Sequence, residues 1–145
     1  MNAADPHTIV RGYRPTDRPG YLELMEAVFG RPALHNDYAA TLDRVLGAGA
    51  AVVRIAERAG SVVGAATGGY DGSRGWLYAV AVAPDVRRAR LGTRLVRAVE
   101  EALIERGCPK VNLQVRAGNE PVVAFYESLG YAVEPRVSLG KRLGV

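Results

Sequence analysis

Cysteine, histidine and large aromatic residues are scarce in this chain of 145 residues. It has one cysteine, Cys108, so no internal disulfide can form. Its two histidines, His7 and His35, are too few and too scattered to make a zinc cluster. Phenylalanine occurs twice and tryptophan once. We therefore expect a fold that depends on its apolar core, with neither disulfides nor a metal.

Long hydrophobic runs are also absent. The longest run, residues 76–83, is far shorter than the roughly 18 to 20 apolar residues of a membrane helix, and the first residues contain no signal-peptide core. Hydrophobic residues make up 48% of the chain and charged residues 23%, as in ordinary globular proteins. The length suits one domain, and no linker or repeat divides the chain. We expect a single cytoplasmic domain over residues 1–145, with no membrane segment.

The positive charge is concentrated in one place. The net charge is +4, but residues 87–97 contain five arginines and no acidic residue, which leaves 14 − 15 = −1 for the rest of the chain. A nucleic-acid-binding protein usually has a broad basic surface, whereas a single basic cluster beside Gly92 favours one anionic group held in one place. We therefore do not expect nucleic acid as a partner.

The spacing of apolar residues predicts a mixed sheet with helices packed on it. The predicted strands are residues 8–13, 51–57, 61–70, 76–82, 110–116, 131–137 and 139–143. The predicted helices are one capped by Thr16 or Asp17 and ending at Gly30, one over about 37–46, one over about 90–106 and one from Asn119 to Gly130. In the third helix, Arg97 and Glu101 are spaced to form an ion pair.

The segment that follows residues 76–82 carries the strongest functional signal. Its almost wholly apolar strand predicts burial on both faces, and Pro84 ends it. A short basic loop then opens a helix, where unpaired backbone N–H groups and the positive end of the helix dipole attract an anion. Gly92 allows the backbone to approach that anion closely. A pyrophosphate suits this arrangement better than a single carboxylate.

The common nucleotide-binding and hydrolase motifs are missing. There is no G-x-x-x-x-G-K-S/T P-loop, no G-x-G-x-x-G after a strand and no G-x-S-x-G elbow. The segment instead resembles the pyrophosphate motif Q/R-x-x-G-x-G/A of the GNAT superfamily of N-acetyltransferases. Arg87 and Gly92 match its first and last positions, and residues 82–84 match the V-x-P strand end that precedes it. Arg90 departs from the motif, which usually has glycine there.

A second GNAT pattern, N-x-x-(x)-A-x-x-x-Y-x-x-x-G-F/Y, has its counterpart near the end of the chain. The matching residues are Asn119, Ala124, Phe125, Tyr126, Gly130 and Tyr131. Residues 68–75, 106–110 and 138–143 are similar to the YpeA-type bacterial subgroup. The resemblance covers residues 61–143 well and the first sixty residues only by the order of the elements.

The resemblance implies an α/β (α+β) GNAT fold, with a mixed, mostly antiparallel sheet flanked by helices, and an acetyl-CoA-dependent N-acyltransferase. The acceptor it implies is a primary amine, in a small molecule, a protein N-terminus or a lysine. It assigns Tyr126 as the acid that protonates the departing thiolate. The residues implied to contact acetyl-CoA are Val80, Ala81, Val82, Arg87, Arg88, Ala89, Arg90, Leu91, Gly92, Thr93, Asn119 and Tyr126.

Several alternatives stay open at this stage. Tyr126 also fits a core position, and Asn119 fits a helix cap. No residue stands out as the general base: Glu57 and Asp71 are candidates, and a water relay serves equally well. The competing functions are a non-catalytic RNA or polyanion module that uses residues 87–97, and a CoA-binding regulatory domain without turnover. A homodimer is also open.

Overall fold

A computed structural model describes residues 6–32 and 37–144, with the side chains of residues 87–89 left out. These residues form two compact units, 1–113 and 114–145, apart from the undescribed positions, and we describe each unit by itself. The expected single domain over the whole chain stays a prediction.

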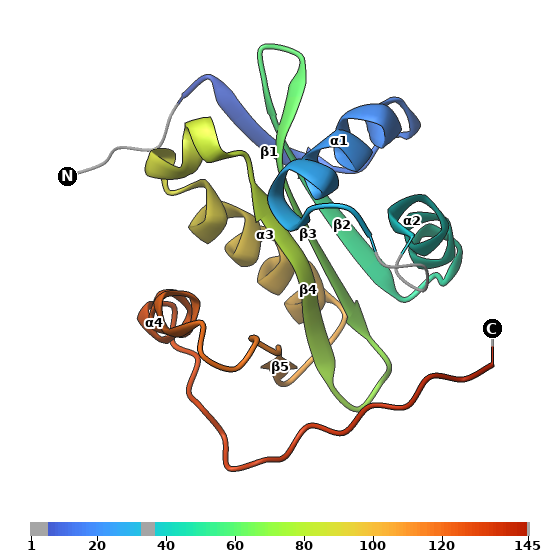
Figure 1. Ribbon diagram of the computed structural model, residues 1–145, viewed down its shortest axis with the longest axis vertical. Helices are drawn as coiled ribbons and strands as arrows, with labels where there is room; N and C mark the ends of the chain where they lie inside the picture. Colours follow the sequence, from blue (N-terminus) through green and yellow to red (C-terminus); the bar gives the residue numbers. More distant parts are fainter. Residues whose placement is uncertain (1–5, 33–36, 145) are drawn as a thin grey trace. The chain divides into compact units, whose positions relative to one another are not determined.

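The first unit is built on a mixed sheet (Figure 1). Its described strands are ordered β1-β2-β3-β4-β5, with antiparallel pairing from β1 to β4 and parallel pairing between β4 and β5. Their bounds are β1 Thr8–Gly12, β2 Ala51–Arg58, β3 Ser61–Tyr70, β4 Gly75–Val82 and β5 Val111–Asn112. This confirms the expected mixed, mostly antiparallel sheet.

Helices cover both faces of this sheet. Helix α3, Leu91–Glu105, packs its apolar stripe on one face, as its 3.6-residue spacing predicts. Helices α1, Arg18–Phe29, and α2, Tyr38–Gly47, cover the other face (Figure 1). Small residues let α3 lie close to the sheet: a Cβ at Gly68 would overlap Val99 and lie 3.2 Å from the Trp76 carbonyl oxygen.

An ion-pair network links residues 11–17 to strand β2 of the sheet. Asp17 is only 5% exposed and accepts two hydrogen bonds of 2.8 Å from the Arg11 guanidinium and one of 2.7 Å from the Arg14 N–H. The Arg11 guanidinium also donates to Glu57 on β2 at 2.6 Å. The Asp17 side chain therefore does not form the cap of α1 that the sequence predicts, but accepts from the N–H that precedes the short 3-10 helix Pro15–Asp17. The contacts with Arg11 hold its pKa below the ordinary value.

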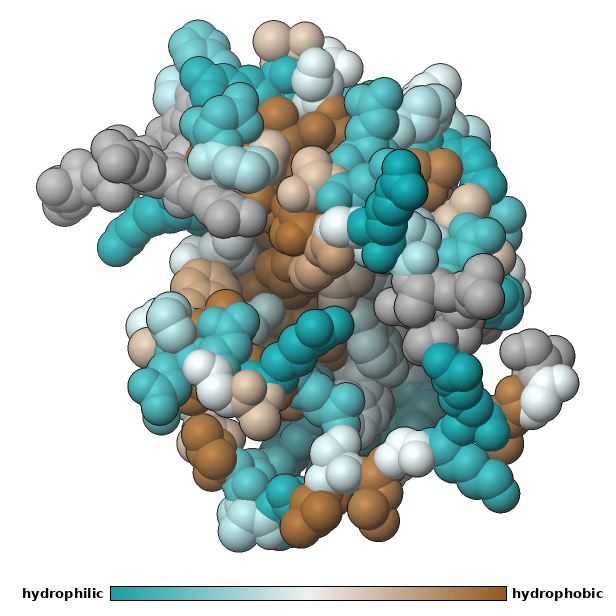
Figure 2. All heavy atoms as spheres, in the orientation of Figure 1, coloured by the Kyte–Doolittle hydropathy of each residue, from teal (hydrophilic) through white to brown (hydrophobic). Residues whose placement is uncertain are grey.

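The second unit contains helix α4, Glu120–Ser128, which begins after Asn119 and ends near Gly130 as predicted. The strands predicted over 131–137 and 139–143 are wrong, because the described residues 131–144 form no strand. Their apolar side chains are left exposed, Leu139 at 90%, and Figure 2 shows separate apolar patches along this segment. The strand predicted over 110–116 is likewise reduced to β5, Val111–Asn112.

Candidate active site

Strand β4 has one edge that is mostly open. Strand β3 pairs with residues 75–78, 81 and 82 of β4, but β5 pairs with it only at Gly75 and Trp76. Among the described residues, no strand pairs with residues 77–82 on that side, and Figure 1 shows β4 extending well beyond β5. The backbone N–H and C=O groups that point to this edge are not taken up by pairing with another described strand.

A β-bulge interrupts β4 at the middle of this open edge. Ala65 pairs with Ala81 and Thr67 pairs with Tyr78, so Ala79 and Val80 together stand opposite a single residue of β3. Ala79 has φ +50°, a left-handed conformation that L-residues adopt at a cost. The prediction that this strand is buried on both faces is wrong here, because the bulge leaves Tyr78 and Ala79 exposed.

The backbone direction along β4 follows from one hydrogen bond. The Ala83 N–H donates to the Val63 carbonyl on β3 at 2.8 Å, so Ala83 and Ala81 turn their N–H groups toward β3. The alternation of a strand then turns the Val82 N–H away from β3, whereas Val80 lies in the bulge, where the regular alternation is interrupted. Val80, Ala81 and Val82 lie along this part of β4, and their contact with the thioester stays a prediction.

The basic segment after β4 is a short 3-10 helix, Pro84–Ala89, rather than an irregular loop. It includes the backbone of Arg87, Arg88 and Ala89, whose side chains lie outside the described part of the chain. Helix α3 starts directly afterwards at Leu91. Because the 3-10 helix ends and α3 begins here, the first N–H groups of α3 have no acceptor within their own helix.

The first residues of α3 differ in how deeply they are buried. Leu91 is fully buried, whereas Gly92 and Thr93 are half-buried. The Arg94 N–H donates to the Arg90 carbonyl at 3.2 Å and closes the first turn. The N–H groups of residues 91–93 precede this bond and, with the helix dipole, favour an anion at this helix end; that one binds there stays a prediction.

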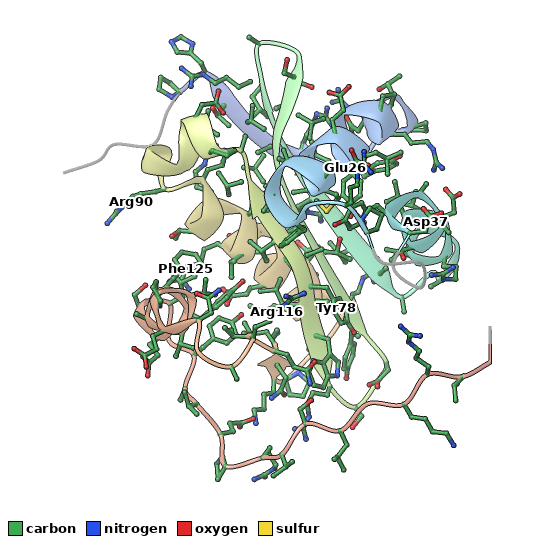
Figure 3. All side chains as sticks on the ribbon, viewed as in Figure 1. Glu26, Asp37, Tyr78, Arg90, Arg116 and Phe125 are labelled. Carbon is green, nitrogen blue, oxygen red and sulfur yellow. The ribbon has the colours of Figure 1, made fainter. Side chains whose placement is uncertain are left out.

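Arg90 joins the two helices in a left-handed conformation, with φ +56° and ψ +27°. Glycine adopts this conformation without strain, which explains physically why the motif has glycine at this position. The Arg90 side chain is exposed and points away from α3 in Figure 3, as expected for a guanidinium turned outward. The backbone turn is thus kept despite the side chain.

Two other arginines of the basic cluster make side-chain contacts of their own. Arg94 is half-buried and donates to the Thr8 carbonyl at 2.8 Å, tying α3 to β1. Arg97 was predicted to pair with Glu101, but it pairs with Glu100 at 3.4 Å; an i, i+3 spacing also places two side chains side by side on a helix. Neither arginine contributes to the anion-binding end through these contacts.

Tyr126 lies on α4 among aromatic side chains of its own unit. Its ring lies 5.0 Å from the Phe125 ring and 5.6 Å from the Tyr131 ring, both edge to face. Burial raises the pKa of its hydroxyl to about 12, so the phenol carries its proton throughout the neutral range. Asn119, at the start of α4, is exposed, and its side chain makes no capping hydrogen bond.

The two candidate bases are engaged elsewhere. Glu57 lies on β2 and accepts from Arg11. Asp71 accepts from the N–H groups of Ser73 and Arg74 at 2.8 and 2.9 Å, and these bonds hold its pKa below the ordinary value. Asp71, with its lowered pKa, is a weak base, and Glu57 is held by its contact with Arg11, so neither residue suits the role.

No group of three metal-ligating side chains occurs among the described residues, which leave out His35. No helix in the described part of the chain is long and apolar enough to span a membrane.

Comparisons with known proteins agree with this geometry. The model of the acetyltransferase (GNAT) family matches residues 18–131. An acetyltransferase of Yersinia enterocolitica is 41% identical over 108 residues, covering 74% of this chain and 77% of the relative. An acetyltransferase of Sodalis glossinidius is 44% identical over 109 residues, with the same coverage.

A solved structure of AAC(6')-Iy, bound to the bisubstrate analogue CoA-S-monomethyl-acetylneamine, superposes with a TM-score of 0.78. It covers 94% of this chain and 99% of that chain at 20% identity, which shows a shared fold. The chain belongs to the GNAT acetyltransferase family, an enzyme family that uses acetyl-CoA. The similarity to the YpeA-type subgroup stays a prediction.

Proposed function

We propose that this protein transfers the acetyl group of acetyl-CoA to a primary amine. The observation that carries the proposal is the open, bulged edge of β4, which leads through a short 3-10 helix into the N-terminus of α3. One continuous stretch of the first unit thus supplies both backbone donors and an anion-binding helix end. The acceptor amine is a small molecule, a protein N-terminus or a lysine, and no metal takes part.

The proposed substrate site divides into two parts. The backbone of Val80, Ala81 and Val82 faces the thioester carbonyl, and residues 87–93 face the pyrophosphate. Arg87 and Arg88 add positive charge, whereas Leu91, Gly92 and Thr93 donate through their backbone. Asn119 and Tyr126 are assigned to the cofactor from the family spacing.

The reaction makes one bond and breaks another. The amine nitrogen attacks the carbonyl carbon, the C–S bond breaks, the nitrogen loses a proton and the thiolate gains one. Donors that are already oriented stabilise the charge that develops on the carbonyl oxygen, and the Val80 N–H is our candidate. An amine with a pKa of about 10.4 must first lose a proton, for which a water relay is our proposal now that Glu57 and Asp71 are engaged.

The pKa of Tyr126 limits how its hydroxyl can act on the departing thiolate. Its pKa of about 12 exceeds the roughly 8.5 of a free thiol, so full proton transfer from the phenol to the thiolate is unfavourable in the unliganded protein. A hydrogen bond from the phenol to the developing thiolate carries no such penalty. We propose that Tyr126 stabilises the leaving group through this bond and completes the transfer as CoA departs.

The competing functions are now less favoured. Family membership supports an enzyme over a polyanion-binding module. A CoA-binding regulatory domain would bind acetyl-CoA without releasing thiol, so turnover distinguishes it. We further propose a cytoplasmic location, and a homodimer stays a prediction.

The test combines binding and turnover. Calorimetry should detect acetyl-CoA binding, and Arg87→Ala should weaken it about ten- to a hundredfold, since a hydrogen bond to a charged group contributes about 1.5 to 3 kcal/mol. Arg97→Ala is the matched control and should change affinity little. Turnover is measured as thiol released with spermidine, tyramine, neamine or a short peptide beginning with alanine.

Tyr126→Phe should leave acetyl-CoA affinity nearly unchanged and lower kcat by about 10² or more. A decrease below about threefold would make Tyr126 a packing residue instead. Absence of binding at millimolar acetyl-CoA would refute the proposed function altogether.

A further inference from the structure

Tyr78 occupies a distinctive place directly before the bulge of β4. It pairs with Thr67 on β3, so both side chains lie on the same face of the sheet. Thr67 is buried and shares a hydrogen bond with Tyr21 of α1. Tyr78 therefore projects from the face that α1 and α2 cover, opposite to the face covered by α3.

The Tyr78 side chain is exposed although buried residues of β4 stand before it and after the bulge. It is 51% exposed, whereas Leu77 is 4% exposed and Ala81 1%. Among the described residues, nothing forms a hydrogen bond with its hydroxyl, and Figure 3 shows it on β4 below the level of Glu26 on α1. Aromatic surface left open in the middle of a sheet is available to a ligand.

The chemistry of Tyr78 suits contact rather than proton abstraction. Partial burial, followed by the charge of Asp71, raises the pKa of its hydroxyl above the ordinary value. The phenol thus stays neutral at physiological pH and cannot serve as a base. What it offers is a ring face with negative partial charge, which attracts cations.

The position of the ring relative to the bulge links it to the acceptor, and this step rests on the proposed function. If the thioester carbonyl lies at the backbone of Val80, Tyr78 is two strand residues away, or about 7 Å along the backbone. The attacking nitrogen must come within about 3 to 3.5 Å of the carbonyl carbon. The Tyr78 ring is long enough to border the space that the nitrogen occupies.

We propose that Tyr78 is a specificity-determining wall of the acceptor site, on the side of the sheet covered by α1 and α2, and that it favours amines that arrive as ammonium ions. The ring holds the cation by a cation–π interaction before the nitrogen loses its proton. The acceptor class is therefore a strongly basic alkylamine rather than a weakly basic aromatic amine.

Two substitutions distinguish the contribution of the aromatic ring of Tyr78 from that of its hydroxyl. Tyr78→Leu keeps apolar bulk but removes the ring, and should raise the acceptor KM roughly two- to fivefold. Tyr78→Phe keeps the ring and should leave that KM unchanged. Ile104→Ala, an exposed apolar residue on α3, is the control for loss of surface side chain. The acceptor is whichever of spermidine, tyramine, neamine and the alanyl peptide the wild type acetylates fastest.

The experiment compares the KM for the acceptor amine with the KM for acetyl-CoA. The inference requires a raised acceptor KM in Tyr78→Leu with unchanged acetyl-CoA KM and unchanged thermal unfolding. An unchanged acceptor KM, or an equal rise for acetyl-CoA, overturns it. Faster wild-type turnover of aniline than of all four alkylamines also overturns it, whereas failure of the wild type to acetylate any amine refutes the proposed function itself.

Discussion

Replacing Arg90 with glycine should stabilise the protein, because Arg90 has a left-handed backbone with φ +56°. An L-residue in this conformation costs about 1–2 kcal/mol. Glycine removes that cost but loses about 0.5–1 kcal/mol more conformational entropy on folding. The net gain in unfolding free energy should be about 0.5–1 kcal/mol.

The expected change in melting temperature follows from the length of the chain. For 145 residues the unfolding entropy is about 0.3 kcal/mol per kelvin, so Arg90→Gly should raise Tm by about 2–3 °C. Arg97→Gly is the matched control, since Arg97 lies within α3 and glycine there should cost about 1 kcal/mol. Differential scanning calorimetry of both variants should therefore give shifts of opposite sign.

A lowered Tm in Arg90→Gly would refute the assignment of strain to this residue. A ligand measurement adds a second readout. Because the backbone turn is kept, the variant should still bind acetyl-CoA. If the outward guanidinium contacts the 3′-phosphate, the preference for CoA over dephospho-CoA should fall; an unchanged preference would show that it does not.

Two further substitutions test the contacts that hold the fold. Asp17→Asn should cost about 2–3 kcal/mol at pH 7, because it weakens charged hydrogen bonds to Arg11. The lowered pKa of Asp17 means that its stabilisation is present above about pH 4 and is lost as the pH falls further, so urea unfolding of the variant should be less sensitive to acid. Gly68→Ala should cost about 1–3 kcal/mol through overlap with Val99, while Gly47→Ala, which meets no atom within 4 Å, should not destabilise.

Local periodicity was sufficient to predict the helices. The apolar spacing in α3 places Leu95 and Val99 on one stripe, and both are fully buried. Asp37 before α2 accepts from the Ala39 N–H at 2.9 Å, as a helix cap does. These features depend on neighbours a few residues away, which the sequence displays directly.

Features that depend on pairing between distant segments were not predictable in this way. The apolar run 76–82 correctly indicated a strand, but the bulge at Ala79 depends on its register with β3. A tyrosine within an apolar run was the one available signal. Alternation over 110–116 suggested a long strand, yet only Val111–Asn112 pairs with β4, because alternation does not specify a partner.

Strained backbone occurs at two places in or beside the proposed substrate segment. Three described non-glycine residues have positive φ: Ala59, Ala79 and Arg90. Ala59 sits with Gly60 in the tight β2–β3 hairpin turn, which demands this conformation. No hairpin explains the other two. Ala79 is followed two residues later by the buried Ala81, and Arg90 directly by the fully buried Leu91. Core packing on each side thus holds a conformation that the backbone alone disfavours. Strain of this kind is kept where geometry serves a ligand, and Ala79 directly precedes the stretch 80–93 that we assign to acetyl-CoA while Arg90 lies within it.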